Sequence, residues 1–526
     1  MPVLILVCLV TAHAQAVPAP SDVVMYEVNL RAFSQAGNLA GVTARLDDVQ
    51  ALGANTLWLM PIHPIGQINM KGELGSPYSV RDYGAVSSEY GALSDLTTLI
   101  DAAHQRGMSV LMDWVANHTA WDHPWISAHP DWYTQDAQGQ IIHPPGTNWT
   151  DVADLNYASQ AMRSAMISEM QYWVTDVGID GYRADVADGV PFDFWQQAIS
   201  AVRGSTTRPL LMLAEGSRND HYAAGFDLTF GWNYYNTVKS VFISGSPATA
   251  LGAANASAFA NVPAGKSILR FTTNHDESAW DATPVTLFGG LDASLAAYAV
   301  TVAYGGTPLV YDGQEIGWGP NIPFFSKAPL DWTTGQATAD WYSQLLGIRG
   351  DHPALRDGTV TDQSSADVAM LMRESGDDRV LVLVNTRGQT SQVQVPAAWQ
   401  GGWFDLFNGQ AAALGTTRTL APYEVLILGT APVLAGDLDG DGFVGIGDLN
   451  LVLSNWNQPV PPGDPLADTN GDGFVGIDDL NTVLGNWNAG TPPPPEVLGN
   501  VPEPGTAGLV AVAGVLWTGR RHTRCK

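Results

Sequence analysis

The sequence predicts an α/β protein: a (β/α)8 TIM barrel, then an antiparallel β-sandwich, then a small α-helical module. Three observations support this prediction. Short apolar runs alternate with helical segments over residues 22–355. Over residues 356–431 the pattern changes to short alternating runs separated by Gly, Asp and Asn. Finally, one unit occurs twice, beginning at Asp437 and again 31 residues later at Asp468.

The barrel prediction rests on strands that alternate with amphipathic helices. In the stretch at 94–107, Leu96, Leu99, Ile100 and Ala103 fall on one helical face. Eight strand–helix units in about 330 residues fit a closed barrel with a short insertion after strand three, at about 119–175. The clearest expected strands are NTLWLMPI at 55–62, SVLMDWV at 109–115, PLLMLAE at 209–215, SILRFTTN at 267–274 and TPLVYDG at 307–313.

Four runs predict the sandwich at 356–431, because each is short and either alternating or wholly apolar. They are VAMLMRE, VLVLVNT, SQVQVPA and YEVLILG. The repeated unit fills residues 436–488, and a duplication this faithful indicates a module of its own. A Pro-rich segment at 491–500 then predicts a stiff linker.

Charge and the N-terminus limit the class of protein. The formal net charge of −28 argues against a nucleic-acid partner, whose phosphates it would repel, and suits a neutral substrate or bound cations. The run from Val3 to Val10 is continuously apolar, and Ala12, Ala14 and Ala16 follow in Ala-x-Ala patterns, which predicts a secretory signal peptide at residues 1–16. No basic residue precedes the apolar run, so a buried first strand is the alternative.

Four polar clusters follow expected strands: DWVANH at 113–118, GYRAD at 181–185, AEG at 214–216 and TNHDES at 273–278. In a TIM barrel the carboxyl ends of the strands build the active site. Acidic residues there are costly to bury for structure alone and are therefore candidate catalysts.

Asp185 and Glu215 would end the neighbouring strands four and five, a suitable separation for the two carboxyls of a retaining glycosidase. Arg183 lies two residues before Asp185, on the same side of the strand, and is expected to keep Asp185 ionised as a nucleophile. Glu215 follows an apolar run, so burial is expected to keep it protonated as the acid. Asp276 can stabilise the oxocarbenium charge, and His118 and His275 can donate hydrogen bonds to sugar hydroxyls.

With these clusters placed, residues 22–430 resemble the alpha-amylase family of glycoside hydrolases, glycoside hydrolase family 13. Seven motifs occur in the family's order. They are SPYSVRDYG at 76–84, DWVANH at 113–118, VADLN at 152–156, GYRADVADG at 181–189, AEG at 214–216, FTTNHD at 271–276 and DGQE at 312–315. The resemblance places the nucleophile on Asp185, its orienting arginine on Arg183, the acid/base on Glu215, the third carboxylate on Asp276 and the sugar-stacking tyrosine on Tyr78.

The resemblance implies hydrolysis of α-1,4-glucosidic bonds in starch or maltooligosaccharides. In the fourth motif the family often carries Lys and His, which help bind the leaving-side sugars, and this chain has Asp188 and Gly189. An α-glucosidase or a glucan transglycosylase is therefore the alternative. The family's barrel calcium would use Asn117 and Asp154, but Gly189 could supply only a carbonyl to it. A non-catalytic glucan-binding scaffold is disfavoured, because it would not need all three carboxyls.

The repeated unit carries two loops with the calcium pattern of oxygen ligands at positions 1, 3, 5 and 12 and Gly at position 6. The ligands expected in the first loop are Asp437, Asp439, Asp441 and Asp448, and those in the second are Asp468, Asn470, Asp472 and Asp479. Asp at position 12 and one helix per loop resemble a type I dockerin, which implies docking to a cohesin-bearing protein. A calcium-stabilised spacer is the alternative.

The C-terminal residues 501–526 begin with Val-Pro-Glu-Pro, continue through an apolar run and end with basic residues. This order resembles the PEP-CTERM sorting signal, which a membrane protease removes in that family. It implies transient membrane contact and a secreted or envelope-associated enzyme. A plain C-terminal membrane anchor is the alternative, although the apolar run is shorter than the roughly 20 residues of a spanning helix.

Overall fold

The computed structural model describes residues 17–430, 435–439 and 443–489. The expected signal peptide, the linker, the sorting signal and Asp441 lie outside the described residues. The chain divides into two compact units, 1–430 and 431–526. No helix in the described part of the chain has the length and apolar character needed to cross a membrane.

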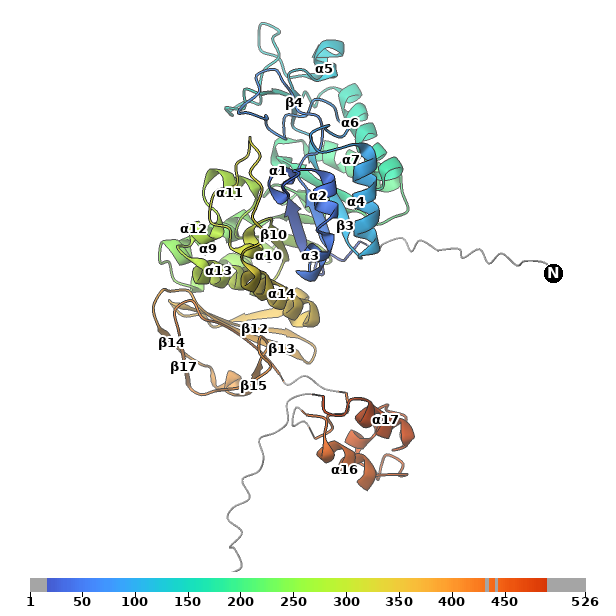
Figure 1. Cartoon of the computed structure of the whole chain (residues 1–526), viewed down its shortest axis with the longest axis vertical. Coiled ribbons are helices and arrows are strands. Elements are labelled where there is room, and N and C mark those ends of the chain that lie inside the picture. Colours follow the sequence, from blue (N-terminus) through green and yellow to red (C-terminus); the bar gives the residue numbers. More distant parts are fainter. Residues whose placement is uncertain (1–16, 431–434, 440–442, 490–526) are drawn as a thin grey trace, which may run out of the picture. The chain divides into compact units, whose positions relative to one another are not determined.

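A closed barrel of eight parallel strands forms the centre of the first unit, which confirms the predicted fold (Figure 1). Its strands follow one another around the barrel in chain order, and β10 pairs with β1 to close it. They are β1 (Met25–Val28), β2 (Thr56–Leu59), β3 (Ser109–Val115), β6 (Gly181–Asp185), β7 (Leu211–Ala214), β8 (Leu228–Phe230), β9 (Ser267–Arg270) and β10 (Thr307–Tyr311).

The barrel strands are buried on both faces, as expected of the apolar runs that predicted them. Side chains of one parity, such as Trp58 and Leu111, fill the barrel interior. Those of the other parity, such as Leu57 and Val110, pack under the helices. This period of two fixes which residues point inward at the active end.

The helical layer covers the outside of the barrel. The predicted face of α4 is confirmed, because Leu96, Leu99, Ile100 and Ala103 are all buried. The longer helices are α4 (Leu93–Gln105), α6 (Gln160–Tyr172), α7 (Phe192–Gly204), α9 (Trp232–Ile243), α10 (Thr249–Phe259), α13 (Leu291–Ala303) and α14 (Gln336–Asp351). The shorter helices are α1 (Leu30–Phe33), α2 (Leu39–Thr43), α3 (Leu46–Ala51), α5 (Pro124–Ala128), α8 (His221–Ala224), α11 (His275–Trp280), α12 (Pro284–Leu287) and α15 (Pro353–Asp357).

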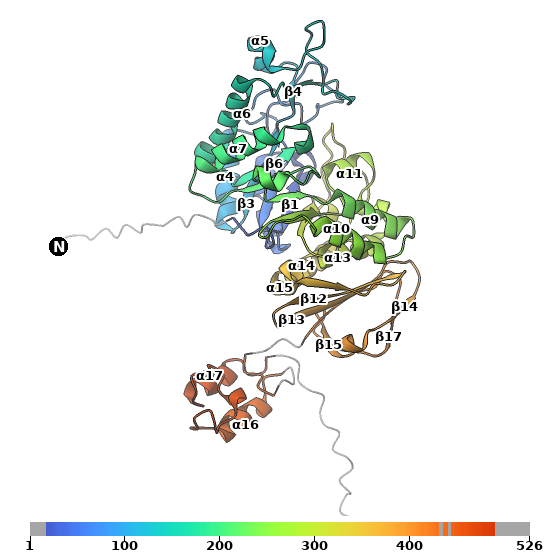
Figure 2. The ribbon, with the colours of Figure 1, turned by 180° about the vertical axis from the view of Figure 1, so that it is seen from behind.

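The excursion after β3 carries a two-stranded antiparallel sheet, β4 (His118–Ala120) with β5 (Val152–Asp154). It rises beyond one end of the barrel together with α5, which Figure 2 shows from behind. The expected insertion, about 119–175, also contains α6, and α6 packs beside α7 in the helical layer. The part that projects from the barrel therefore ends before α6.

The C-terminal part of the first unit is a pair of antiparallel sheets around one apolar core, as the four sandwich runs predicted. The larger sheet also packs against α13 and α15 of the barrel. In spatial order the larger sheet is β11 (Thr359–Asp362), β12 (Val368–Ser375), β13 (Asp378–Asn385), β18 (Val425–Gly429), β15 (Gly401–Asp405) and β16 (Ala411–Leu414), and the smaller is β14 (Ser391–Gln394) with β17 (Thr417–Leu420).

In the second unit the duplicated sequence forms a duplicated structure, with helices α16 (Ile446–Ser454) and α17 (Ile477–Gly485). Val444 and Val475, at equivalent positions, are both fully buried in its small core. The backbone of Val475 bonds to the segment after α16, and that of Val444 bonds to the segment after α17. Each repeat therefore supplies backbone hydrogen-bond partners to the other, and the two form one folded unit.

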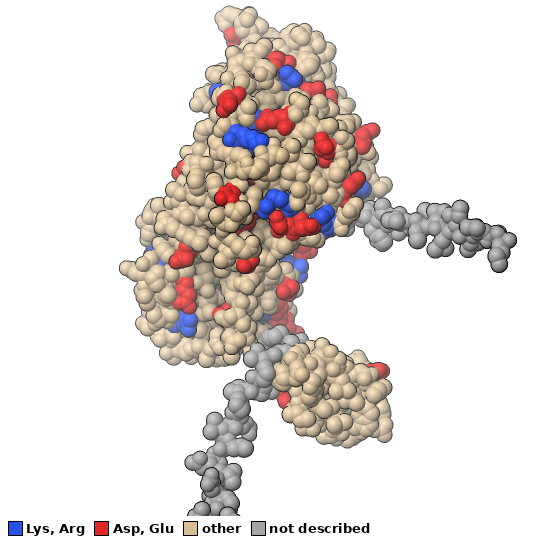
Figure 3. All heavy atoms as spheres, in the orientation of Figure 1, with Lys and Arg blue, Asp and Glu red and all other residues tan. Residues whose placement is uncertain are grey.

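Charged side chains on the face of the first unit in Figure 3 are sparse and of both signs. Lys and Arg are interspersed with Asp and Glu there, and most of that face is uncharged.

Candidate active site

A cavity of about 430 Å³ lies at the carboxyl ends of the barrel strands and brings the predicted residues together. Asp185, Glu215, Asp276, Tyr78, His118 and His275 all line it. Arg183 lies directly beneath them and is fully buried. The other lining residues are Lys71, Ser76, Asn148, Trp149, Asp151, Val152, Val186, Trp280, Phe324 and Phe325.

Arg183 is the centre of the site. Its Nη1 donates to Asp185 Oδ1 at 2.9 Å, and its Nη2 forms an ion pair with Glu215 Oε1 at 2.9 Å. One guanidinium thus holds both candidate catalytic carboxyls. Because β6 and β7 are adjacent parallel strands, Asp185 and Glu215 leave the barrel side by side.

Asp113, the acidic residue of the DWVANH cluster, also bonds to Arg183, although the sequence predicted no individual role for it. Both of its carboxylate oxygens accept from Arg183 Nη1, at 2.9 and 3.1 Å. Its Oδ2 accepts in addition from Trp58 Nε1 and the Tyr78 hydroxyl. Asp113 is fully buried, so it holds Arg183 from below and is not exposed to a substrate.

Val186 follows Asp185 in a left-handed conformation, with φ of +44°. This region is disfavoured for a β-branched residue, and such strain concentrates at functional sites. The strained turn directs the Val186 N–H to Glu215 Oε2 at 2.8 Å, while Ala187 N–H donates to the Glu215 carbonyl. The residues after Asp185 therefore fix the position of Glu215.

Burial raises the pKa of Glu215, although the Arg183 charge opposes the rise. This direction agrees with its expected role as an acid. Burial raises the pKa of Asp185 as well. Arg183 lowers it, but the charges of Glu215 and Asp113 add to the rise. Arg183 therefore favours the ionised form of Asp185, while burial and the two neighbouring carboxyls oppose it.

His275 begins the short helix α11, where Asn274 caps the helix by accepting from Glu277 N–H. Burial lowers its pKa, but the charges of Asp276 and Glu27 and a hydrogen bond to Glu27 raise it overall to about 9. The resulting cation donates through Nδ1 to Glu27 and through Nε2 to the Tyr78 oxygen, at 2.9 Å from Nε2. By contrast, burial lowers the pKa of His118 to about 4, so His118 is neutral.

Aromatic rings form one wall of the cavity. Tyr78 stacks on His275 with 5.3 Å between ring centroids and on Phe324 with 5.7 Å. Trp280 lies at the mouth, packs against Phe324 and Phe325, and is 63% exposed. Flat apolar faces of this kind suit the faces of sugar rings.

Asp188, which stands where the family often has a leaving-side lysine, does not line the cavity. Its carboxylate accepts from the backbone N–H groups of Ser217 and Arg218 and from His221 Nε2. These hydrogen bonds from Ser217, Arg218 and His221 to Asp188 fix the loop that follows Glu215. Gly189 lies against Asn117, since a Cβ added at Gly189 would come within 2.6 Å of Asn117 Oδ1.

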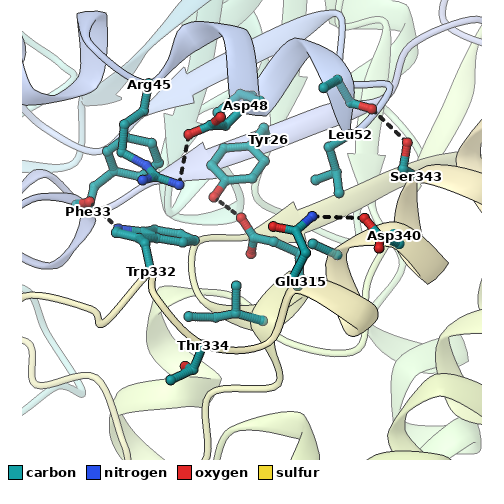
Figure 4. A pocket seen from close by; sticks show the side chains of 15 residues that line it. Tyr26, Phe33, Arg45, Asp48, Leu52, Glu315, Trp332, Thr334, Asp340 and Ser343 are labelled. Carbon is teal, nitrogen blue, oxygen red and sulfur yellow. Dashed lines mark hydrogen bonds and ion pairs between the residues drawn. The ribbon is translucent and has the colours of Figure 1, made fainter.

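A second cavity, of about 280 Å³, contains none of the candidate catalytic residues (Figure 4). The Arg45 guanidinium covers the face of Trp332 there, 4.3 Å from the ring centroid. Glu315, the last residue of DGQE, accepts from the Tyr26 hydroxyl. Burial raises the pKa of Glu315 to about 7, so this part of the motif is a buried structural carboxyl.

In the second unit, the carboxylates of Asp437, Asp439 and Asp448 offer oxygens within 4.8 Å of one another. Asp448 and Asp479 are buried at equivalent positions, and each accepts backbone N–H groups that close its own loop. The side chain of Asp472 accepts from Phe474 N–H, and Asp468 accepts from Asp472 and Gly473 N–H groups. Asn470 Oδ1 also accepts from Asp472 N–H. The side-chain oxygens of the second loop therefore bond to backbone N–H groups of the same loop.

Known proteins resemble this chain over the barrel. The catalytic domain of the alpha-amylase family matches residues 29–367. The alpha-amylase MalA of Haloarcula japonica is 27% identical over 412 residues, covering 74% of this chain and 58% of that protein. An α-1,4-glucan:maltose-1-phosphate maltosyltransferase of Rhodospirillum rubrum is 26% identical over 422 residues, covering 70% of this chain and 56% of that protein. The chain thus spans less than two thirds of the length of either relative.

Among solved structures, an alpha-amylase from Lactobacillus plantarum is 28% identical with a TM-score of 0.71, covering 78% of this chain and 99% of that one. The maltogenic alpha-amylase AmyB from Thermotoga neapolitana is 26% identical with the same TM-score and the same coverage. The family match spans more than half of the chain and contains every residue that lines the cavity. The chain therefore belongs to the alpha-amylase family of glycoside hydrolases.

Proposed function

We propose that this protein hydrolyses α-1,4-glucosidic bonds in starch or maltooligosaccharides with retention of configuration. The observation that carries the proposal is the single Arg183 guanidinium that holds Asp185 and Glu215 in a cavity shared with Asp276. Retaining glycosidases need two carboxyls about 5–5.5 Å apart, and neighbouring barrel strands held by one guanidinium favour that spacing.

In the proposed mechanism, Glu215 protonates the leaving oxygen while the Asp185 carboxylate attacks the anomeric carbon. The first proton transfer leaves Glu215 ionised, and it then takes a proton from the water that releases the glycosyl group from Asp185. Asp276 stabilises the oxocarbenium charge. Tyr78 stacks on the sugar, and His118 bonds to its hydroxyls. His275 Nε2, which donates to Tyr78 in the free site, would bond to a sugar hydroxyl by exchanging that hydrogen bond.

An α-glucosidase or a glucan-transferring enzyme is the second candidate. Asp188 favours this second candidate. It stands where the family often has a lysine that binds the leaving-side sugars of a long chain, and its carboxylate instead bonds within the loop after Glu215. The maltosyltransferase named above is a relative of this kind.

Product chromatography tests the proposal. The protein is incubated with soluble starch, maltotriose and maltose, next to an Asp185→Asn variant. We expect maltooligosaccharides or glucose from the wild type only, because an amide cannot form the glycosyl–enzyme bond. Near-normal turnover by Asp185→Asn would overturn the assignment of the nucleophile. Glucose alone from maltose would favour the α-glucosidase.

For residues 436–488 the proposal is a calcium-binding dockerin. Carboxylate oxygens are the ligands that calcium prefers, and the oxygens gathered from Asp437, Asp439 and Asp448 suit such an ion. The carbonyls of Phe443 and Phe474 would add to the two ligand sets. Calcium would neutralise carboxylates that otherwise repel one another, and a cohesin-bearing protein would be the partner.

A separate calcium site is proposed in the barrel unit. Its ligands would be Asn117 and Asp154, with Gly189 beside Asn117 supplying its carbonyl.

The proposed location is secreted or associated with the cell envelope. It rests on the apolar segment at 1–16 and on the resemblance of 501–526 to a sorting signal.

A further inference from the structure

One segment, residues 67–75 between β2 and α4, covers part of the catalytic cavity and is called here the cover loop. Its Lys71 Nζ donates to the Asn148 carbonyl at 2.9 Å and forms an ion pair with Asp151 Oδ1 at 3.0 Å. Asn148 and Asp151 belong to the excursion after β3. All three residues line the cavity, so this bridge forms part of its wall.

The cover loop is joined to the loop after β10 as well. Leu74 N–H donates to the Phe325 carbonyl at 3.0 Å. Gly72 has a φ of +67°, and a Cβ added there would come within 2.4 Å of Phe325 Cβ. The close approach therefore depends on glycine, and it brings Phe325 against the cover loop at the cavity.

A buried arginine fixes the base of the cover loop. Arg31 is 1% exposed and donates to the carbonyls of Leu74 and Gly75 at 2.9 and 2.7 Å. Glu89 pairs with the same guanidinium at 2.7 Å. Three sets of contacts therefore fix the cover loop: those of Arg31, those of Asn148 and Asp151, and those of Phe325. The loop forms a fixed part of the cavity wall.

The barrel topology shows which side of the cavity this wall closes. Its members follow β10, β2 and β3, which with β1 form one continuous arc of the barrel. Glu215 follows β7, outside that arc, and is held by Val186 after β6. Because the acid must reach the leaving oxygen, the leaving sugars lie on the Glu215 side. The wall therefore faces the non-leaving part of the substrate.

We propose that the Lys71–Asp151 ion pair and the cover loop that it anchors close the non-leaving side of the cavity and make the enzyme act on chain ends. This inference rests on the proposed function. The substrate would be a short maltooligosaccharide or the non-reducing end of a glucan, from which the enzyme removes short units.

The test uses maltoheptaose labelled at its reducing end, with the cleavage position read from the labelled products, and kcat/KM measured for maltoheptaose and maltose. We expect the wild type to remove short units from the non-reducing end. Lys71→Ala opens the wall, so cleavage should spread to internal bonds. The ratio of kcat/KM for maltoheptaose to that for maltose should rise about tenfold, which corresponds to about 1.4 kcal/mol.

Three variants complete the experiment. Lys71→Arg should keep the wild-type pattern, because it can keep the ion pair, and Asp151→Asn should spread cleavage as Lys71→Ala does. Lys266→Ala is the matched control, since Lys266 pairs with Asp227 at 2.8 Å outside the cavity and should leave the pattern unchanged.

Internal cleavage by the wild type, or an unchanged pattern in both Lys71→Ala and Asp151→Asn, would overturn the inference while leaving the proposed function intact. No cleavage of either substrate by the wild type would overturn both.

Discussion

At the level of single residues, the candidate site is a network of ion pairs and hydrogen bonds that begins in the barrel interior, below the cavity. Asp113 accepts from Arg183, and Arg183 holds Asp185 and Glu215. A second branch runs from Glu27 through His275 to Tyr78, whose hydroxyl donates to Asp113. The residues proposed to contact a sugar are therefore oriented by two fully buried carboxyls, Glu27 and Asp113.

Glu27→Gln is expected to lower the pKa of His275, because Glu27 raises that pKa both by its charge and by accepting a hydrogen bond. A His275 that must be cationic loses its proton as pH rises through about 9 in the wild type and at a lower pH in the variant. The alkaline limb of kcat/KM against pH should therefore shift towards lower pH, with the acidic limb unchanged.

Glu277→Gln is the control for that shift. Glu277 lies two residues from His275, but it accepts from Tyr235 and does not line the cavity. An alkaline limb that stays in place in Glu27→Gln would show that catalysis does not require a cationic His275.

At the scale of strands and loops, the sequence allowed the barrel and the exposed half of the site to be predicted. Glu215 and His275 follow runs that were expected to be strands, Asp185 is the last residue of β6, and the carboxyl ends of barrel strands meet at one end. Glu27 gave no such signal, because it lies inside β1. Asp113 belongs to the DWVANH cluster, but its bond to Arg183 depends on the pairing register of β3 with β6, which the sequence does not show.

Loops were the less predictable part of the site. Trp280, Phe324 and the cover loop have no strand period, and their positions depend on contacts between loops far apart in sequence. Strand β8 was not singled out either, since its three residues are too few to show a pattern. In the sandwich, β15–β17 were missed because they are partly exposed, and because β15 contains Gly and β16 contains Ala.

The turn after β10 supplies a prediction about stability. Burial raises the pKa of Glu315 from 4.5 to about 7. A carboxyl whose pKa is higher in the folded state destabilises the fold as pH rises from about 4.5 to 7, by roughly 3 kcal/mol for that rise in pKa. Glu315→Gln stays neutral. Its melting temperature relative to the wild type should therefore be higher at pH 8 than at pH 5.

Thermal melts of both proteins at the two pH values check this expectation. Glu374→Gln serves as a control, because Glu374 lies at the surface of β12 in an ion pair with Arg379. A melting-temperature difference between Glu315→Gln and the wild type that does not change with pH would show that Glu315 does not titrate in this range.

At the scale of the whole molecule, the protein joins a large enzyme unit to a small duplicated one. The first has extensive apolar cores, whereas the core of the second is built on five buried side chains in its described residues. So small a core does little to offset the repulsion among the clustered carboxylates. We therefore expect the second unit to depend on calcium for its fold.

Limited proteolysis of the full chain tests that dependence. An excess of chelator should expose residues 436–488 to cleavage while the barrel unit stays resistant, and added calcium should restore protection. Asp448→Ala and Asp479→Ala together should behave like the chelated wild type, because each carboxylate closes one loop. Equal resistance with and without chelator would contradict a calcium-dependent fold.

Asp185 and Glu215 are proposed to cleave α-glucosidic bonds by double displacement. The most direct measurement is the anomeric configuration of the first product released from maltotriose, followed by proton nuclear magnetic resonance before mutarotation. Double displacement predicts that the α-anomer appears first, with no product from Asp185→Asn. A β-anomer, or turnover by Asp185→Asn, would contradict the roles given to the two carboxyls.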